Sequence, residues 1–142
     1  MKEIDIPVII ISAGIGNFVK QFLIKNQCDY DNIFIVSNFI KFENGIASGI
    51  IGNVTHSLNK NEVSLPSNVS KLIENRPNII LLGDNVSDVR MAKDEGRNKA
   101  LKIGFLEEKV EENKKHFEDN FDIVCTDNTG FDELSNKISI LK

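Results

Sequence analysis

Two acidic side chains directly follow an apolar run typical of a buried strand, and their spacing suits a metal ion. The run 78–83, NIILLG, ends at Gly83, and Asp84 and Asp88 come next. Glycine permits a sharp turn at a strand end, and carboxylate oxygens are the ligands that Mg²⁺ takes, together with several waters. Either aspartate alone is more often a helix cap or a favourable charge at a helix N-terminus. The whole strand–Gly-Asp–x₃–Asp unit favours a Mg²⁺ site.

Small residues follow a second apolar run, and they could bind phosphate. The run PVIIIS covers residues 7–12, and Ser12, Ala13 and Gly14 lead into a helix-like segment at 15–27. Backbone N–H groups and the partial positive charge at a helix N-terminus together bind phosphate, and the Ser12 hydroxyl can donate to a phosphate oxygen. A tight turn without a ligand explains the same residues equally well, so this motif alone leaves both interpretations open.

The same glycines also resemble the start of a dinucleotide-binding fingerprint. Gly14 and Gly16 have the right spacing, but Val19 occupies the place of the third glycine. The next strand-like run ends in Ser37-Asn38, where a dinucleotide site needs an acidic residue to hold the ribose. We therefore set the dinucleotide interpretation aside.

One lysine and one acidic pair complete the candidates for chemistry. Lys60 could hold a phosphate and offset charge near a metal, although a lone lysine in a loop is usually solvated surface. Asp29 and Asp31 form a tempting carboxylate pair. They lie between a helix-like and a strand-like segment rather than after an apolar strand, so we interpret them as a loop.

The elements that must position these residues alternate between strands and helices. Further strands are expected at 33–37, 100–104 and 121–125, further helices at 67–75 (with Ser67 as cap), 84–94, 107–118 and 131–139, and a small hairpin near 39–52. This alternation predicts an α/β fold, a mostly parallel Rossmann-like sheet with helices on both faces. Ligands of such sheets bind beyond the carboxyl ends of the strands, which is where the serine and the two aspartates of the motifs fall.

Composition narrows the class of protein. The 142 residues fit a single domain over 1–142, with 41% hydrophobic and 27% charged residues. The net charge of −4 argues against a nucleic-acid partner, and no apolar stretch is long enough to cross a membrane. The N-terminus lacks the features of a signal peptide, and the two cysteines have no zinc-site spacing. We therefore expect a cytoplasmic protein without nucleic-acid or membrane partners.

The order of the motifs resembles the haloacid dehalogenase (HAD) superfamily. A strand ending in serine, a later lysine and then Gly-Asp-x₃-Asp are similar to its motifs two, three and four. The blocks IPVIIISAGIG, IVSNFIKF, NK, NIILLGDNVSDVRMA, LKIGFL and FDIV resemble the cytosolic 5′-nucleotidase III family of pyrimidine-specific nucleotidases. The resemblance runs from about Ile6 to the last expected helix.

The resemblance implies roles for the phosphate-binding residues. Ser12, with the amides around Ala13 and Gly14, would bind the substrate phosphate. Lys60 would position both the phosphate and the catalytic nucleophile. The substrate would be a nucleoside 5′-monophosphate, chiefly UMP or CMP, which the family hydrolyses through an aspartyl-phosphate intermediate.

The resemblance also implies a Mg²⁺ cofactor. Asp84 would be a direct Mg²⁺ ligand, and Asp88 would support the metal site through water and take part in catalysis. The metal and the lysine would stabilise charge on the transferring phosphoryl group.

One departure from the family pattern is large. In the family, the nucleophile and the acid/base lie in an Asp-x-Asp motif on the first core strand, upstream of a helical cap that reads the base. No residue before Ile6 could supply them. We therefore expect a C-terminal portion of the core that lacks the first strand and the cap and is inactive alone.

Two other functions stay open. The chain could be a non-catalytic phosphate-binding or regulatory module that completes its sheet with a partner, either a separate N-terminal segment or a second copy. It could also be a flavodoxin-like domain whose acids are only helix caps.

Overall fold

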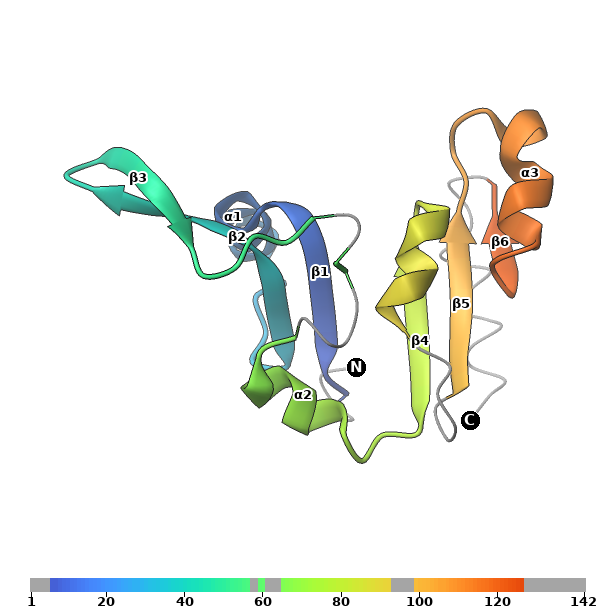
Figure 1. Ribbon diagram of the computed structural model, residues 1–142, viewed down its shortest axis with the longest axis horizontal. Helices are drawn as coiled ribbons and strands as arrows, with labels where there is room; N and C mark the ends of the chain where they lie inside the picture. The colour runs from blue at the N-terminus through green and yellow to red at the C-terminus, as the bar shows by residue number, and fades with distance from the viewer. Residues whose placement is uncertain (1–5, 57–58, 61–64, 93–98, 127–142) are drawn as a thin grey trace. The chain divides into compact units, whose positions relative to one another are not determined.

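Two compact units make up the chain, and each is described by itself (Figure 1). The first unit is Met1–Pro77 and the second is Asn78–Lys142. The computed structural model describes residues 6–56, 59–60, 65–92 and 99–126. Each unit holds one three-stranded sheet. The single domain expected over the whole chain stays a prediction.

The first unit contains a mixed sheet with the order β1-β2-β3. Its strands are β1 (Val8–Ile15), β2 (Ile33–Glu43) and β3 (Ile46–Ile51), and α1 (Gly16–Lys25) connects the first two. The pair β1–β2 is parallel, and the helical crossover is the connection that parallel neighbours need. The strand β2 is longer than the expected 33–37, because its second half pairs antiparallel with β3.

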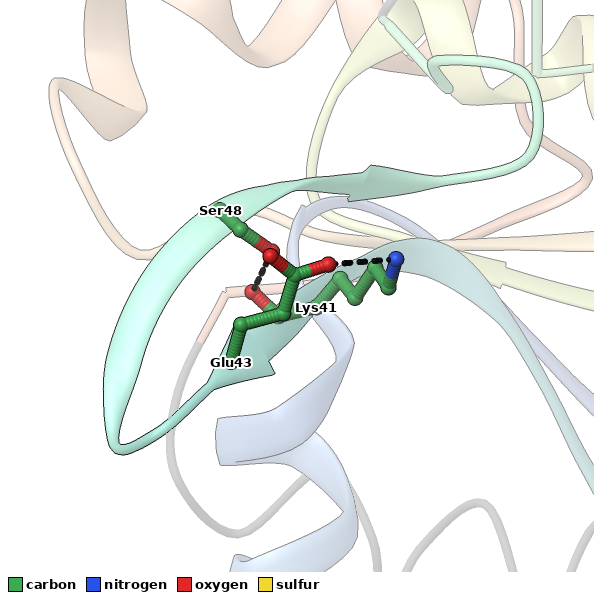
Figure 2. Close-up of polar contacts among 3 residues, drawn as sticks. All are labelled: Lys41, Glu43 and Ser48. Carbon is green, nitrogen blue, oxygen red and sulfur yellow. Dashed lines mark hydrogen bonds and ion pairs between the residues drawn. The ribbon is translucent and has the colours of Figure 1, made fainter.

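The antiparallel pair forms a hairpin whose turn is set by Asn44 and Gly45. Both have positive φ, 53° and 80°, as a two-residue turn matching the strand twist requires. Figure 2 shows polar contacts along this hairpin: the Lys41 ammonium lies 2.7 Å from the Glu43 carboxylate, and the Ser48 hydroxyl donates to the Lys41 carbonyl at 3.3 Å. Both charged side chains are 60% exposed, so their ion pair contributes little stability.

A short helix covers one face of the parallel pair. The alternating residues of β1 and β2 point to this face, and α2 (Ser67–Ile73) packs against them through Val69. The cluster consists of buried Val36, Leu65 and Val69 and of partly buried Ile9, Ile11, Phe34 and Ile73. The helix α2 therefore supports β1, whose carboxyl end carries Ser12, Ala13 and Gly14, together with β2.

The start of α2 differs from the sequence prediction. Ser67 was expected to cap the helix, but the N-cap position belongs to Pro66, which has φ −55° and ψ 145°, and no side chain caps the helix. Proline is pre-set for this φ and can precede a helix without a backbone N–H of its own. Ser67 is therefore the first helical residue and not the cap.

The second unit contains a fully parallel sheet with the order β4-β5-β6. Its strands are β4 (Asn78–Gly83), β5 (Lys99–Phe105) and β6 (Ile123–Cys125). A 3-10 helix, η3 (Val86–Met91), follows β4 where a longer helix was expected, and α3 (Val110–Glu118) joins β5 to β6. The helix expected at 131–139 lies outside the described residues.

The core of the second unit forms on one face of its sheet. Leu81 is 5% exposed, whereas its neighbours Ile80 and Leu82 are 46% and 43% exposed. The rings of Phe117 and Phe121 stack with centroids 5.3 Å apart. The buried members of the cluster are Leu81, Ala92, Leu106, Phe117 and Phe121. The described strands are mostly parallel and alternate with helices, which confirms the predicted α/β fold.

Candidate functional site

The residues predicted to bind phosphate form a bulge at the carboxyl end of β1. Between Ile11 and Ile15 the register against β2 shifts, so that residues 12–14 face a single residue of the partner strand. Such a bulge leaves the ladder and re-aims its side chains and peptide groups. We call residues 12–14 the Ser12 bulge. Ala13 and Gly14 are exposed, and Ser12 is half-buried.

The Ser12 hydroxyl is arranged to act as a donor. Its Oγ accepts a hydrogen bond from the Gly14 N–H at 3.1 Å, and a hydroxyl that accepts can still donate its own proton. The helix α1 then begins at Gly16 with no acidic residue in its first turn, so its partial positive charge is not offset there. The Ser12 hydroxyl therefore keeps its proton for a phosphate oxygen, whereas the Gly14 N–H is already used by Ser12 Oγ, and phosphate binding at the bulge stays a prediction.

Gly16 is required for a reason that the sequence did not reveal. A Cβ at this position would lie 2.7 Å from the Phe39 ring. Phe39 belongs to β2, so the absent side chain lets the start of α1 approach that strand closely. The second glycine of the apparent dinucleotide fingerprint thus serves packing.

Side chains of β2 hold the Ser12 bulge in place. Asn38 Nδ2 donates to the Ala13 carbonyl at 2.8 Å and to the Thr55 carbonyl at 2.9 Å, and the Thr55 N–H donates to Asn38 Oδ1 at 2.7 Å. The Ser37 hydroxyl donates to the Gly14 carbonyl at 2.9 Å. In the sequence these two residues mattered only because neither is acidic, so their structural role was missed.

Lys60 follows a loop that an asparagine closes. Asn59 Oδ1 accepts from the His56 N–H at 2.7 Å, and its Nδ2 donates to the Val54 carbonyl at 2.9 Å. The Asn59 N–H in turn donates to the His56 carbonyl at 3.1 Å. Lys60 is half-buried, unlike a fully solvated surface lysine. Asn38, which is bonded to both Thr55 and Ala13, joins the start of this loop to the Ser12 bulge.

The acidic pair of the second unit lies at the carboxyl end of β4, but the capping residue is neither of the two. Asn85 is the N-cap of η3, and its Oδ1 accepts from the Ser87 N–H at 2.9 Å. Asp88 Oδ2 accepts from the Asn85 N–H at 3.2 Å, which completes a capping box. The interpretation of Asp84 as a cap is wrong, and the Asp84 carboxylate is exposed just past the strand.

Gly83 makes room for the Asp88 side chain. A Cβ at Gly83 would lie 2.8 Å from the Asp88 Cβ and 3.1 Å from its Oδ2. The carboxylate of Asp88, which is only 3% exposed, therefore folds back over the end of β4. Gly83 was expected to permit a sharp turn, yet its φ is not in the left-handed region, so the close approach of Asp88 is what requires it.

The two aspartates suit Mg²⁺ as a donor set. Both Asp84 and Asp88 supply carboxylate oxygens at one strand end, the ligand type that this ion prefers. Within the described ranges, no group of three or more His, Cys, Asp or Glu side chains gathers that could hold a metal ion. The remaining positions around Mg²⁺ would have to be filled by water and by a substrate phosphate, as is usual for this ion.

The other acidic pair lies at the opposite end of the first unit's parallel strands from the Ser12 bulge. Asp29 and Asp31 belong to the loop between α1 and β2, where the Ile33 N–H donates to the Tyr30 carbonyl at 3.0 Å. This loop precedes β2 and so marks the amino end of that strand. The loop interpretation is confirmed.

In the part of the chain that the structure describes, no helix has the length and apolar character needed to span a bilayer.

Comparisons with known proteins identify the family. The chain matches the sequence model described as "Pyrimidine 5'-nucleotidase (UMPH-1)" over residues 1–141. The 7-methylguanosine phosphate-specific 5′-nucleotidase of Mus musculus is 42% identical over 123 residues, which is 84% of this chain and 41% of the relative. The Drosophila melanogaster protein of the same name is 34% identical over 145 residues, or 100% of this chain and 46% of the relative.

A solved structure shows the same fold. The crystal structure of cytosolic 5′-nucleotidase IIIB bound to cytidine superimposes with a TM-score of 0.77 and 38% sequence identity, and the match covers 85% of this chain and 42% of that one. The chain thus spans less than half the length of the relatives it matches. The resemblance predicted from the sequence motifs is confirmed, and the chain belongs to the UMPH-1 family of pyrimidine 5′-nucleotidases.

Proposed function

We propose that this chain binds the phosphate of a nucleoside 5′-monophosphate together with Mg²⁺, as part of a 5′-nucleotidase. The observation that carries the proposal is the position of the polar residues. In a chain of a nucleotidase family, the Ser12 bulge ends β1 and the pair Asp84 and Asp88 follows β4. The carboxyl ends of parallel strands are where such sheets bind ligands.

The first unit supplies the groups for the phosphate. The Ser12 hydroxyl, which accepts from the Gly14 N–H, donates its proton to a phosphate oxygen. The residues Ala13 and Gly14, both exposed, lie beside it. The Lys60 ammonium neutralises the negative charge of the phosphate and of the transferring group.

The second unit supplies the groups for the metal. The exposed carboxylate of Asp84 would hold Mg²⁺, and the buried carboxylate of Asp88 would support the ion through water. Mg²⁺, when bound, withdraws charge from the phosphoryl oxygens as a Lewis acid. The capping box fixes the Asp88 carboxylate beforehand, so little order is lost when the ion binds.

Two classes of nucleotide, which differ in their base, are candidates for the substrate. The family description names pyrimidine nucleotides, and the superimposed enzyme holds cytidine, so UMP and CMP are our first assignment. The mouse and fly relatives are named for 7-methylguanosine phosphate, which makes 7-methylguanosine 5′-monophosphate the second candidate. The superimposed enzyme is named cytosolic, and we propose the cytoplasm for this protein too.

The residues assigned above bind phosphate and Mg²⁺ and neutralise the charge of the phosphate, but none of them is the nucleophile. The resemblance to the HAD superfamily implies an aspartate nucleophile in an Asp-x-Asp motif, and the one such pair in this sequence, Asp29 and Asp31, lies before β2 rather than after a strand. We therefore expect the 142-residue chain to bind nucleotide without appreciable turnover.

A paired binding and turnover assay tests this proposal. The chain is titrated calorimetrically with UMP, CMP and 7-methylguanosine monophosphate in MgCl₂, and phosphate release is followed in the same samples. We expect binding that Asp84→Asn weakens and that Asp29→Asn, an exposed acid on the loop before β2, leaves unchanged. No binding of any nucleotide would contradict the site, whereas hydrolysis abolished by Asp84→Asn would contradict the expected lack of turnover.

A further inference from the structure

We propose that Asn38 is a positioning residue that couples the Ser12 bulge to the loop leading to Lys60, so that the two phosphate-binding groups are held as one unit. This inference rests on the proposed function of Ser12 and Lys60. Asn38 itself is not assigned any contact with substrate.

The hydrogen bonds of Asn38 use both ends of its amide. Both Nδ2 bonds go to carbonyl oxygens, that of Ala13 at 2.8 Å and that of Thr55 at 2.9 Å. Its Oδ1 accepts the Thr55 N–H at 2.7 Å. An asparagine amide has two N–H donors, and here the two are shared between segments that lie 25 and 17 residues away in sequence. One side chain therefore joins two distant segments.

On the first side, the bond to Ala13 sets the direction of the Ser12 hydroxyl. The peptide between Ala13 and Gly14 is planar and trans, so its C=O and N–H point in opposite directions. Because Asn38 holds the carbonyl, the Gly14 N–H is turned the other way, where it donates to Ser12 Oγ at 3.1 Å. The hydroxyl that would face a phosphate is thus oriented through two hydrogen bonds in series, one from Asn38 to the Ala13 carbonyl and one from the Gly14 N–H to Ser12 Oγ.

On the second side, the bonds to Thr55 anchor the loop that ends at Lys60. Thr55 is 9% exposed, and Asn38 binds both its N–H and its C=O. The next residue, His56, is closed onto Asn59 by two hydrogen bonds of 2.7 and 3.1 Å. Without Asn38, the buried peptide groups of Thr55 would lose their partner, which is costly for buried polar groups, and the loop would lose its attachment to β2.

The test compares two asparagines of the first unit. In Asn38→Ala both attachments are removed, and in Asn38→Asp the acceptor for the Thr55 N–H is kept while both donated bonds are lost. Asn32→Ala is the control, because Asn32 joins β2 to the start of β1 through a 2.8 Å bond to the Ile6 carbonyl, at the amino end of the strands. Circular dichroism confirms that each variant is folded.

Inorganic phosphate is the probe, and binding is followed by calorimetry and by amide chemical shifts. We expect Asn38→Ala and Asn38→Asp to weaken phosphate binding by about tenfold, the factor that corresponds to loss of about one well-placed charged hydrogen bond, while Asn32→Ala changes it less than twofold. Ser12→Ala should then cost much less in the Asn38→Ala background than in the natural chain, because the hydroxyl is already misplaced. A purely structural role would predict equal effects of Asn38→Ala and Asn32→Ala on phosphate binding, and additive losses when Ser12→Ala is combined with Asn38→Ala.

The amide shifts separate this inference from the proposed function. If the natural chain binds no phosphate, the proposed function fails, but the coupling is still decided: Asn38→Ala must shift the amide signals of Gly14 and Lys60 together, and Asn32→Ala must shift neither. A change at only one of the two amides, with or without phosphate binding, overturns the coupling through Asn38.

Discussion

The two units hold their polar residues in opposite ways. In the first unit, Asn38 bridges segments 17 and 25 residues away, so the Ser12 bulge depends on contacts between distant parts of the chain. In the second unit, Asp88 is held by a capping box that spans only four residues, from Asn85 to Asp88. A local motif such as the capping box forms as soon as its own few residues adopt the required backbone conformation. The hydrogen bonds of Asn38 to distant segments form only after the strands have paired.

The largest effect should come from the core that supports the acidic pair. Leu81→Ala removes a side chain that is 5% exposed, and loss of a buried leucine costs about 2–5 kcal/mol. The matched control is Leu82→Ala, which should lower the free energy of unfolding far less, because Leu82 is 43% exposed on the other face of the sheet. Urea denaturation measures both.

Amide exchange of the same variant sharpens the comparison of the units. If the chain is the single domain that the sequence predicts, Leu81→Ala should lower the protection of Val36 in the first unit as much as that of Ile103 in the second. Loss of protection at Ile103 alone would show that the units unfold independently.

The next effect compares two glycines, one in each unit. A Cβ at Gly83 would lie 2.8 Å from the Asp88 Cβ, whereas a Cβ at Gly14 would approach only the Ser12 Oγ, at 3.2 Å. Overpacking of a buried position costs about 1–3 kcal/mol, so we expect that loss for Gly83→Ala. Gly14→Ala should cost less, because a serine hydroxyl can rotate away. Thermal unfolding of the two variants checks the order, and a larger loss at Gly14 would contradict it.

A smaller effect is expected at the cap of η3. Asn85→Ala removes the side chain that accepts from the Ser87 N–H, and loss of such a cap costs about 0.5–2 kcal/mol. Asn85→Asp, which keeps a capping oxygen, should restore most of this stability. The same titrations with MgCl₂ should show weaker binding in Asn85→Ala, since the backbone that carries Asp88 is loosened. Unchanged stability in Asn85→Ala would mean that the capping box does not support the acidic pair.

The smallest effect on stability is expected at Ser12. Its hydrogen bond to the Gly14 N–H is exposed, so Ser12→Ala should change the free energy of unfolding by about 0.5 kcal/mol or less. Its affinity for inorganic phosphate should nevertheless fall by about tenfold, because a donor to a charged ligand is lost. A variant with lower stability but full affinity would reverse this assignment.

This contrast also explains how much of the fold the sequence could predict. The strand 78–83 was predicted at its observed bounds, because its apolar residues and its closing glycine are contiguous. The strand β2 was predicted in two pieces, a strand at 33–37 and the first arm of the hairpin near 39–52, since its second half is exposed or half-buried and pairs with β3. Ser67 was misassigned as a cap because its residue type fits, although Pro66 takes that position.

The candidate site divides in the same way. Asp84 and Asp88 were found because strand, glycine and acids form one short pattern, and even there Asn85 was overlooked as the cap. The sequence distinguishes Asn38 only as a residue at the end of a strand-like run that lacks the acidic group of a dinucleotide site. Its partners Ala13 and Thr55 become neighbours through the pairing of β1 with β2 and the return of the chain after β3, and no local pattern encodes such contacts.

The central claim is that phosphate binding, assigned to Ser12 and Lys60, and Mg²⁺ binding, assigned to Asp84 and Asp88, depend on each other. Calorimetric titration of the chain with inorganic phosphate, with and without MgCl₂, tests it directly, because two ligands that share contacts must raise each other's affinity. We predict that Mg²⁺ strengthens phosphate binding by about tenfold or more, equivalent to about 1.4 kcal/mol of coupling, and that Asp84→Asn removes this gain. Equal phosphate affinity with and without Mg²⁺, unchanged by Asp84→Asn, would contradict the account.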